Sequence, residues 1–202
     1  ELRRLGVKSY YQSFIRRLGN FKECHMMIVV LFRLGHRYVR DNRTTTHLFL
    51  AARALGASCA IYTGKREKEI EETLKKVNES WGGAFSVEHT SNWREALEKY
   101  KSKGFEITHL TMYGLPIQQV MEQIRSSSKD KVVVVGGAKV PKEIYNLADW
   151  NVAVTSQPHS EASAFPIFLH ELFEGKELSK NFPNAKLVIK PQQKGKKVMK
   201  TD

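Results

Sequence analysis

The chain has 202 residues, of which 41% are hydrophobic and 27% charged, a composition that predicts a soluble globular protein and excludes a disordered one. No apolar run reaches the roughly 20 residues of a membrane helix. Two cysteines are too few for a disulfide scaffold and suit a reducing cytoplasm. The formal net charge of +12 favours a polyanionic partner, most simply nucleic acid, although such a charge also keeps a protein in solution.

Residues 1–26 form a basic segment with several aromatic residues. A helix, an RNA-contacting arm and sequence upstream of the true start all remain open for this extension. Residues 191–202 contain four lysines and are expected to form a basic C-terminal tail; solvated surface and phosphate contact are both open interpretations. The intervening residues, 27–190, are expected to form one domain.

Within this domain, short β-branched runs alternate with helical patterns. Strands are predicted at 27–32, 59–63, 84–89, 107–112, 131–136, 151–155 and 186–190. Helices are predicted over about 45–55, 66–80, 93–100, 117–125, 141–148 and 160–173. This alternation is typical of an α/β fold with a mostly parallel sheet flanked by helices.

Ligands of such sheets bind beyond the carboxyl ends of the strands. Three segments follow a predicted strand and precede a predicted helix: "YGLP" (113–116), "GGAKVP" (136–141) and "TSQPHSE" (155–161). The sequence therefore predicts that these segments contribute to one shared site.

In "GGAKVP", Gly136 and Gly137 permit a tight turn and a close approach of a ligand to the backbone, and Lys139 could face an anion. A plain strand-to-helix turn closed by glycines explains the same residues. The segment is not a phosphate loop, because G-x-x-x-x-G-K-[ST] is missing, and no G-x-G-x-x-G opens a helix.

The segment "VTSQPHSE" (154–161) also has two interpretations. Ser160 or Thr155 can cap the following helix, and Pro158 can make the turn rigid. Capping does not explain Gln157 and His159, whose donors and acceptors are of the kind that recognise a heteroaromatic ring.

A third cluster, "RLGHRYVRDNRTTTH" (33–47), follows the first strand. Arginines gathered in one expected loop indicate bidentate recognition of phosphate, and scattered surface charge is the alternative. The histidines of the chain are not at paired metal spacings and no cysteines accompany them, so no zinc site is predicted.

These motifs, together with "HLTMYGLP", "VVGGAKVPKEIYNLADWNVAVTSQPHSE" and "KLVIKPQQKGKKV", resemble the archaeal tRNA ribose 2′-O-methyltransferases that modify cytidine 56. That family belongs to the SPOUT superfamily of knotted methyltransferases. The resemblance covers about residues 27–198 in the right order.

The resemblance implies a C-terminal trefoil knot, a cytoplasmic homodimer with its site completed across the interface, S-adenosylmethionine as the methyl donor, tRNA as the substrate and no metal. It implies that cofactor contacts come from Leu110, Gly136, Gly137, Ala138, Lys139, Val140, Val154, Thr155, Ser156, Gln157, Pro158, His159, Ser160 and Glu161. Arg43 is chosen as the catalytic residue, and the expected RNA-binding residues are Arg33, Arg37, Arg40 and His47. A non-catalytic basic α/β RNA-binding module is the alternative function.

Overall fold

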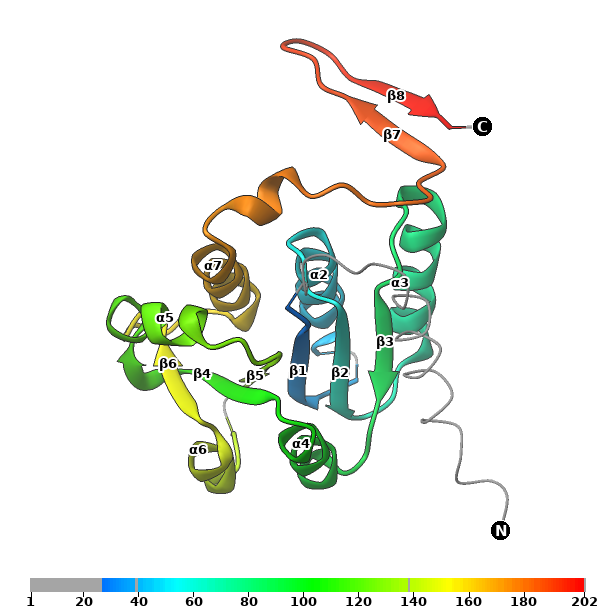
Figure 1. Cartoon of the computed structure of the whole chain (residues 1–202). Helices are drawn as coiled ribbons and strands as arrows, with labels where there is room; N and C mark the ends of the chain where they lie inside the picture. Colours follow the sequence, from blue (N-terminus) through cyan, green and yellow to red (C-terminus); the bar gives the residue numbers. More distant parts are fainter. Residues whose placement is uncertain (1–26, 39, 138, 202) are drawn as a thin grey trace.

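The short β-branched runs of the chain form one parallel sheet. The computed structural model describes residues 27–38, 40–137 and 139–201, and Figure 1 shows how its elements are arranged. Each strand of the sheet pairs in parallel with its neighbours. In spatial order the strands are β3 (Ser86–His89), β2 (Cys59–Gly64), β1 (Val29–His36), β5 (Lys131–Gly136), β4 (Glu106–Pro116) and β6 (Trp150–Ala153). The prediction of a mostly parallel α/β fold is confirmed.

Helices cover both faces of this sheet, because its central strands are apolar on both sides (Figure 1). In β5, Val132, Val133 and Val134 are fully buried. One face packs against α2 (Asn42–Ala54), α3 (Lys68–Trp81), α5 (Ile117–Ser126) and α7 (Glu161–Phe173). The other face packs against α4 (Trp93–Ser102) and α6 (Lys142–Leu147).

Local sequence explains where these helices begin and which side they bury. Ile70 and Leu74 lie one turn apart on α3 and are each 1% exposed, so helical spacing places both in the core. The Asn92 side chain accepts a hydrogen bond from the backbone N of Glu95 at 3.2 Å and caps α4. Ser160 accepts one from the backbone N of Ala162 at 3.1 Å and caps α7, as its place in "PHSE" predicts.

Two strands are longer than the apolar runs that predict them. β1 extends beyond the predicted end at residue 32 to His36, so Arg33 lies in the sheet. The prediction of one loop that holds all four arginines is therefore wrong. β4 extends to Pro116, so Tyr113 belongs to a strand and not to a loop. Polar residues at both strand ends interrupt the apolar pattern, which is why the pattern stops too early.

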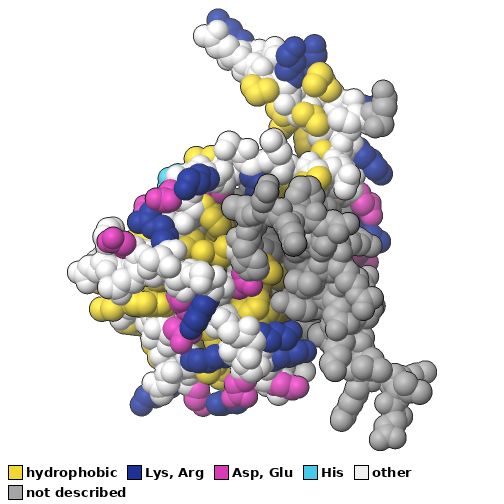
Figure 2. Space-filling view, viewed as in Figure 1, with side chains coloured by type: hydrophobic (Ala, Val, Ile, Leu, Met, Phe, Trp, Pro, Cys, Tyr) yellow, Lys and Arg dark blue, Asp and Glu magenta, His cyan; other side chains and the backbone are white. Residues whose placement is uncertain are grey.

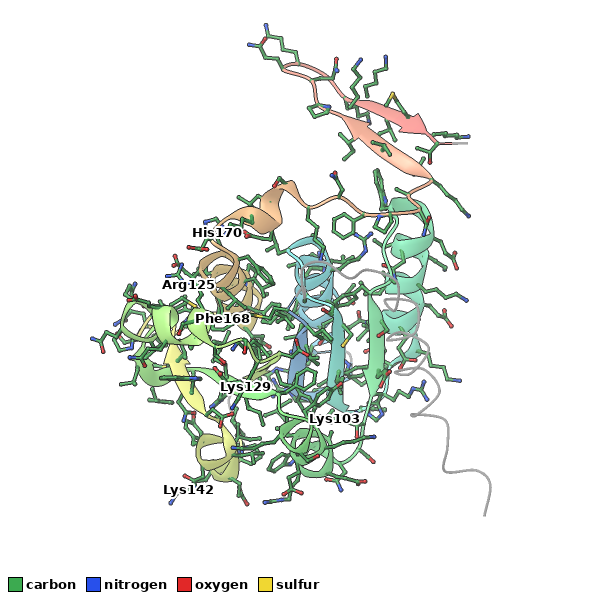
Figure 3. The ribbon with its side chains drawn as sticks, viewed as in Figure 1. Lys103, Arg125, Lys129, Lys142, Phe168 and His170 are labelled. Atoms are coloured by element: carbon green, nitrogen blue, oxygen red, sulfur yellow. The ribbon has the colours of Figure 1, made fainter. Side chains whose placement is uncertain are left out.

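After α7, the chain forms the 3-10 helix η1 (Lys176–Ser179) and then an antiparallel hairpin of β7 (Leu187–Lys190) and β8 (Lys197–Lys200). His170 of α7, labelled in Figure 3, lies with Nδ1 2.7 Å from Oε1 of Glu177 in η1. The predicted C-terminal tail, from residue 191, therefore contains strand β8, and β8 pairs with the strand predicted at 186–190.

Within the described residues, no helix combines the length and apolar character that crossing a membrane requires. The basic extension 1–26 lies outside the described residues.

A buried ion pair joins three strands at the amino edge of the sheet. The Lys131 side chain is fully buried, and its Nζ lies 3.3 Å from Oε2 of Glu106 and donates to the backbone O of Ser127 at 3.3 Å. The other carboxylate oxygen of Glu106 accepts a hydrogen bond from Nε1 of Trp150 at 2.7 Å. Each charge is therefore acceptable in the interior only while the other remains.

We expect Lys131→Met to lower the free energy of unfolding by about 3–5 kcal/mol, because Glu106 keeps a buried charge without its partner. Adding Glu106→Gln should recover a large part of that loss, since the amide oxygen can still accept from Trp150. Urea unfolding followed by circular dichroism measures both variants. A double variant no more stable than Lys131→Met would contradict this account.

Candidate functional site

Two adjoining hollows lie at the carboxyl edge of the sheet. The first has a volume of about 400 Å³ and is lined by His109, Leu110, Thr111, Met112, Tyr113, Val135, Gly136, Gly137, Val140, Tyr145, Val154, Pro158, His159, Glu161 and Ala164. The second, of about 310 Å³, is lined by Arg33, Gly35, Arg37, Arg40, Asp41, Thr44, Gly137, Ser160 and Glu161. Gly137 and Glu161 border both hollows.

The first hollow brings together residues from all three segments that the sequence singles out. Of the predicted cofactor-binding residues, those that line it are Leu110, Gly136, Gly137, Val140, Val154, Pro158, His159 and Glu161. Ser160 lines the second hollow. Lys139, Thr155, Ser156 and Gln157 are exposed and line neither hollow, and Ala138 lies outside the described residues.

A break in the β4–β6 register shapes one wall of the first hollow. Leu110 and Leu115 both pair with Val152, so the four residues between them form a bulge in β4. Gly114 lies so close to β6 that a Cβ atom there would be 2.5 Å from the backbone of Asn151. Only glycine fits this approach, and the bulge it permits within β4 directs Thr111 to Tyr113 to the hollow.

His109 brings a buried hydrogen-bond acceptor to this wall. Its ring is almost fully buried, and Nδ1 lies 2.9 Å from Oδ1 of Asn151, whose Nδ2 donates to the backbone O of Tyr145 at 2.9 Å. Burial lowers the pKa of His109 and outweighs the opposite effect of the Asn151 hydrogen bond. The ring is therefore neutral at pH 7 with its hydrogen on Nδ1. Nε2 has no hydrogen-bond partner in the described part of the chain, and so it is an unsatisfied acceptor.

The second hollow is rich in arginine. Arg37 donates through Nε to Oδ2 of Asp41 at 3.1 Å, and its backbone N donates to the same oxygen at 3.0 Å. Burial alone would raise the pKa of Asp41, but the hydrogen bonds from Arg37 outweigh it and hold that pKa below its usual value. Asp41 thus stays charged and fixes the Arg37 side chain, while Arg40 is exposed at the rim.

Arg33 lies between the hollows and the core. It is 2% exposed, and its Nη2 donates to Oε1 of Glu161 at 2.7 Å. Nη1 lies 3.4 Å from Nδ1 of His36, whose Nε2 lies 2.8 Å from Oε2 of the buried Glu67. Arg33 also lines the second hollow, and its RNA-binding role stays a prediction. Its position suits it to hold Glu161 in place.

Arg43 and His47 lie outside both hollows. They are exposed and four residues apart on α2, so both lie on its outer side. The inner side of that helix is formed by Thr45, Leu48, Phe49 and Ala52, which are all fully buried. The predicted catalytic residue, Arg43, is therefore on the protein surface. It follows the arginines of the second hollow in the sequence but does not line that hollow.

Several lining residues have no role in the sequence prediction, namely His109, Thr111, Met112, Tyr145, Ala164, Asp41 and Thr44. For His109, polar residues within the apolar run "ITHLTM" are the signal that was available. Tyr145 comes from α6, and only the fold brings it to the site. No group of three or more His, Cys, Asp or Glu side chains in the described ranges is placed to hold a metal ion.

The fold resembles that of known RNA-modifying enzymes. The TrmH/SpoU tRNA modifying enzyme of A. aeolicus has a TM-score of 0.58 and 19% identity to this chain, covering 83% of this chain and 85% of its own. The SpoU methyltransferase AviRb from Streptomyces viridochromogenes, in complex with the cofactor AdoMet, has a TM-score of 0.56 and 13% identity, covering 78% of this chain and 60% of its own. The chain thus has the fold of these two structures.

Sequence similarity is closer and identifies the family. The family described as tRNA ribose 2′-O-methyltransferase, aTrm56, matches residues 81–199. The tRNA (cytidine(56)-2′-O)-methyltransferase of Methanosphaera stadtmanae is 47% identical over 176 residues, 87% of this chain and 100% of that protein. The enzyme of the same name from Methanocaldococcus jannaschii is 49% identical over 176 residues, 86% of this chain and 97% of that protein. The chain belongs to the aTrm56 family of tRNA ribose 2′-O-methyltransferases.

Proposed function

We propose that the protein transfers a methyl group from S-adenosylmethionine to the ribose 2′-hydroxyl of tRNA, at cytidine 56. The family membership supports this reaction, because relatives that match over nearly their whole length carry that name. The observation that carries the proposal is the pair of adjoining hollows. One is partly apolar and the other is rich in arginine, and both are bordered by Gly137 and Glu161.

The first hollow fits the methyl donor. Its volume of about 400 Å³ lies within the range of roughly 300–1,000 Å³ for small-molecule sites. Leu110, Val135 and Val140 provide apolar contact, and the unsatisfied Nε2 of His109 can accept from a ligand amine or hydroxyl. The segments 136–140 and 154–161 would hold the donor largely through backbone groups. When bound, S-adenosylmethionine supplies an electrophilic methyl group on a positively charged sulfur.

The residues of the chain then have to position the ribose and favour its oxygen as a nucleophile. In the second hollow, Arg37 and Arg40 can hold the phosphates beside the target nucleotide, with Arg37 fixed by Asp41. Arg43 stabilises the alkoxide that develops as the 2′-hydroxyl loses its proton. It does not accept that proton, because a guanidinium stays protonated, and the proton passes to solvent water. His47, one turn further along α2, lies beside Arg43 and contacts the RNA.

The active form is a homodimer in which Arg43 completes the site of the partner subunit. Two observations support this arrangement. Arg43 lines neither hollow of its own subunit, although the arginine segment precedes it directly. Tyr113 and Leu115, next to the first hollow, are 77% and 54% exposed, and exposed apolar side chains beside a site favour contact with another chain.

We also propose that residues 27–190 form one methyltransferase domain and that the protein is cytoplasmic. The C-terminal part of this domain is proposed to form a trefoil knot. The knot is supported by the course of the chain. The turns after β4, β5 and β6 meet around one hollow, and α7, which follows the edge strand β6, packs against α2 near the other half of the sheet (Figure 1).

Methylation of transcribed tRNA tests the function. The protein is incubated with tRNA and S-adenosylmethionine, and 2′-O-methylation is mapped by mass spectrometry. We expect a single methyl group on the ribose of cytidine 56 and none on a transcript with a 2′-deoxy sugar at that nucleotide, because DNA-like sugars lack the acceptor oxygen. Binding of tRNA without methyl transfer would instead support the non-catalytic RNA-binding module.

A further inference from the structure

The C-terminal hairpin, residues 186–201, concentrates half of the net charge of the chain. It contains no carboxylate, and its six lysines are Lys186, Lys190, Lys194, Lys196, Lys197 and Lys200. Its formal charge is therefore +6, compared with +12 for the whole chain. We call residues 186–201 the lysine hairpin.

These lysines are exposed and form no ion pair with any carboxylate of the described residues. Figure 2 shows Lys and Arg side chains on the hairpin beside hydrophobic ones and no acidic side chains on the visible face. In Figure 3 the hairpin extends away from the rest of the molecule and carries side chains on both of its sides. The charges are thus available to an external anion.

The register of the hairpin places like charges opposite each other. Lys190 of β7 pairs directly with Lys197 of β8, so their side chains lie on the same face of the ribbon. Like charges in directly opposed positions destabilise a strand pair. Lys194 and Lys196 are in the connecting turn and add to the charge at this end. A polyanion bound there would relieve this repulsion, so the arrangement favours a bound partner over the free hairpin.

The hairpin is attached at the opposite edge of the sheet from the two hollows. Its first residue donates from the backbone N of Lys186 to the O of Ser80, in the last turn of α3, at 3.0 Å. α3 runs from the end of β2 back to the amino edge, where Gly83 N donates to Pro183 O at 2.8 Å. Figure 1 shows the hairpin extending beyond this edge. The hairpin and the two hollows therefore lie at opposite edges of the sheet.

We propose that the lysine hairpin is a second tRNA-binding surface, which contacts backbone phosphates remote from the methylated ribose. This inference rests on the proposed function for the identity of the RNA. Phosphate contacts of this kind are independent of sequence and release counterions. The hairpin therefore contributes to the affinity for tRNA and its salt dependence and not to the chemical step.

The test compares two variants with the same change in charge. One is Lys190→Gln, Lys194→Gln, Lys196→Gln and Lys197→Gln in the hairpin. The control carries the same replacement at four exposed lysines of the body, Lys75, Lys76, Lys129 and Lys142, of which Lys129 and Lys142 are labelled in Figure 3. Because the hairpin variant also removes a like-charge pair, we expect it to fold as well as the wild type.

Binding of transcribed tRNA is measured against salt concentration. We expect the hairpin variant to bind tRNA about tenfold or more weakly, and its salt slope to fall by about 0.7–0.9 for each phosphate that the hairpin no longer neutralises. KM for tRNA should rise, while kcat and the affinity for S-adenosylmethionine stay unchanged. The control variant should lose clearly less affinity.

Equal losses of affinity in both variants, or an unchanged salt slope, would overturn the proposal. So would a hairpin variant that changes the molecular mass of the protein in solution and binds tRNA normally, since the hairpin would then join copies of the chain. The binding measurement does not depend on methyl transfer. A wild-type protein that binds tRNA through the hairpin but transfers no methyl group would refute the proposed function and leave this inference intact.

Discussion

Replacing Arg43 with alanine is expected to lower kcat by about 100- to 1,000-fold, the usual effect of losing one donor to a developing oxyanion. The affinity for S-adenosylmethionine should stay within about twofold, because Arg43 lies outside the first hollow. Single-turnover methylation and calorimetric titration with the donor measure the two quantities. Arg40→Ala is the comparison: Arg40 lines the second hollow, so its loss should act mainly on KM for tRNA. A normal turnover rate in Arg43→Ala would exclude its catalytic role.

Mixing two inactive variants then decides which subunit provides Arg43. Gly137→Phe should block the donor hollow without strain, because a Cβ there meets no atom within 4 Å. Re-dimerisation with Arg43→Ala should restore roughly a quarter of the wild-type activity if the arginine acts across a two-fold interface, since half of the dimers regain one of two sites. If Arg43 acts within its own subunit, the mixture stays inactive.

Glu161→Gln is expected to weaken binding of S-adenosylmethionine by about tenfold or more. The substitution leaves the buried guanidinium of Arg33 without its charged partner, 2.7 Å away in the native protein. Breaking such a pair destabilises by about 3–5 kcal/mol when both groups are buried. The Glu161 side chain is 18% exposed, so the lower part of that range applies. The end of the 154–161 segment is then no longer fixed against β1.

The buried pair at the amino edge provides the control for this prediction. Glu106→Gln leaves Lys131 unpaired and should lower stability to a similar extent, but it lies far from both hollows. We therefore expect Glu106→Gln to bind the methyl donor normally at a temperature where both variants are folded. Equal donor affinity in Glu161→Gln and Glu106→Gln would show that Glu161 has only a structural role.

The sequence predicts the sheet and the meeting of three segments well, because both follow from local patterns. Continuous apolar runs such as Val132 to Val135 identify buried parallel strands. Turns that follow parallel strands meet at one edge. The orientation of α2 could also be predicted from the sequence. Leu48, Phe49 and Ala52 define its buried side, so Arg43 and His47 lie on the opposite, exposed side.

Long-range pairing could not be predicted in this way. Arg33 and Glu161 are 128 residues apart, and nothing near Arg33 distinguishes it from the exposed arginines that follow. The burial of Arg33 depends on the extension of β1 between β2 and β5, which a mixed polar sequence does not reveal. His109 is a similar case, because the tautomer that leaves its Nε2 as an acceptor depends on Asn151 and Tyr145, which are distant in the chain.

The shared border of the two hollows has a consequence for inhibition. Gly137 lies where the two hollows meet and has no side chain to separate them. A Cβ atom built at Gly137 would have no neighbour within 4 Å. A single compound that links a donor-like thioether to a ribose could therefore occupy both hollows at once. Such a bisubstrate ligand would bind more tightly than either fragment alone, because the tether makes binding of the second fragment intramolecular.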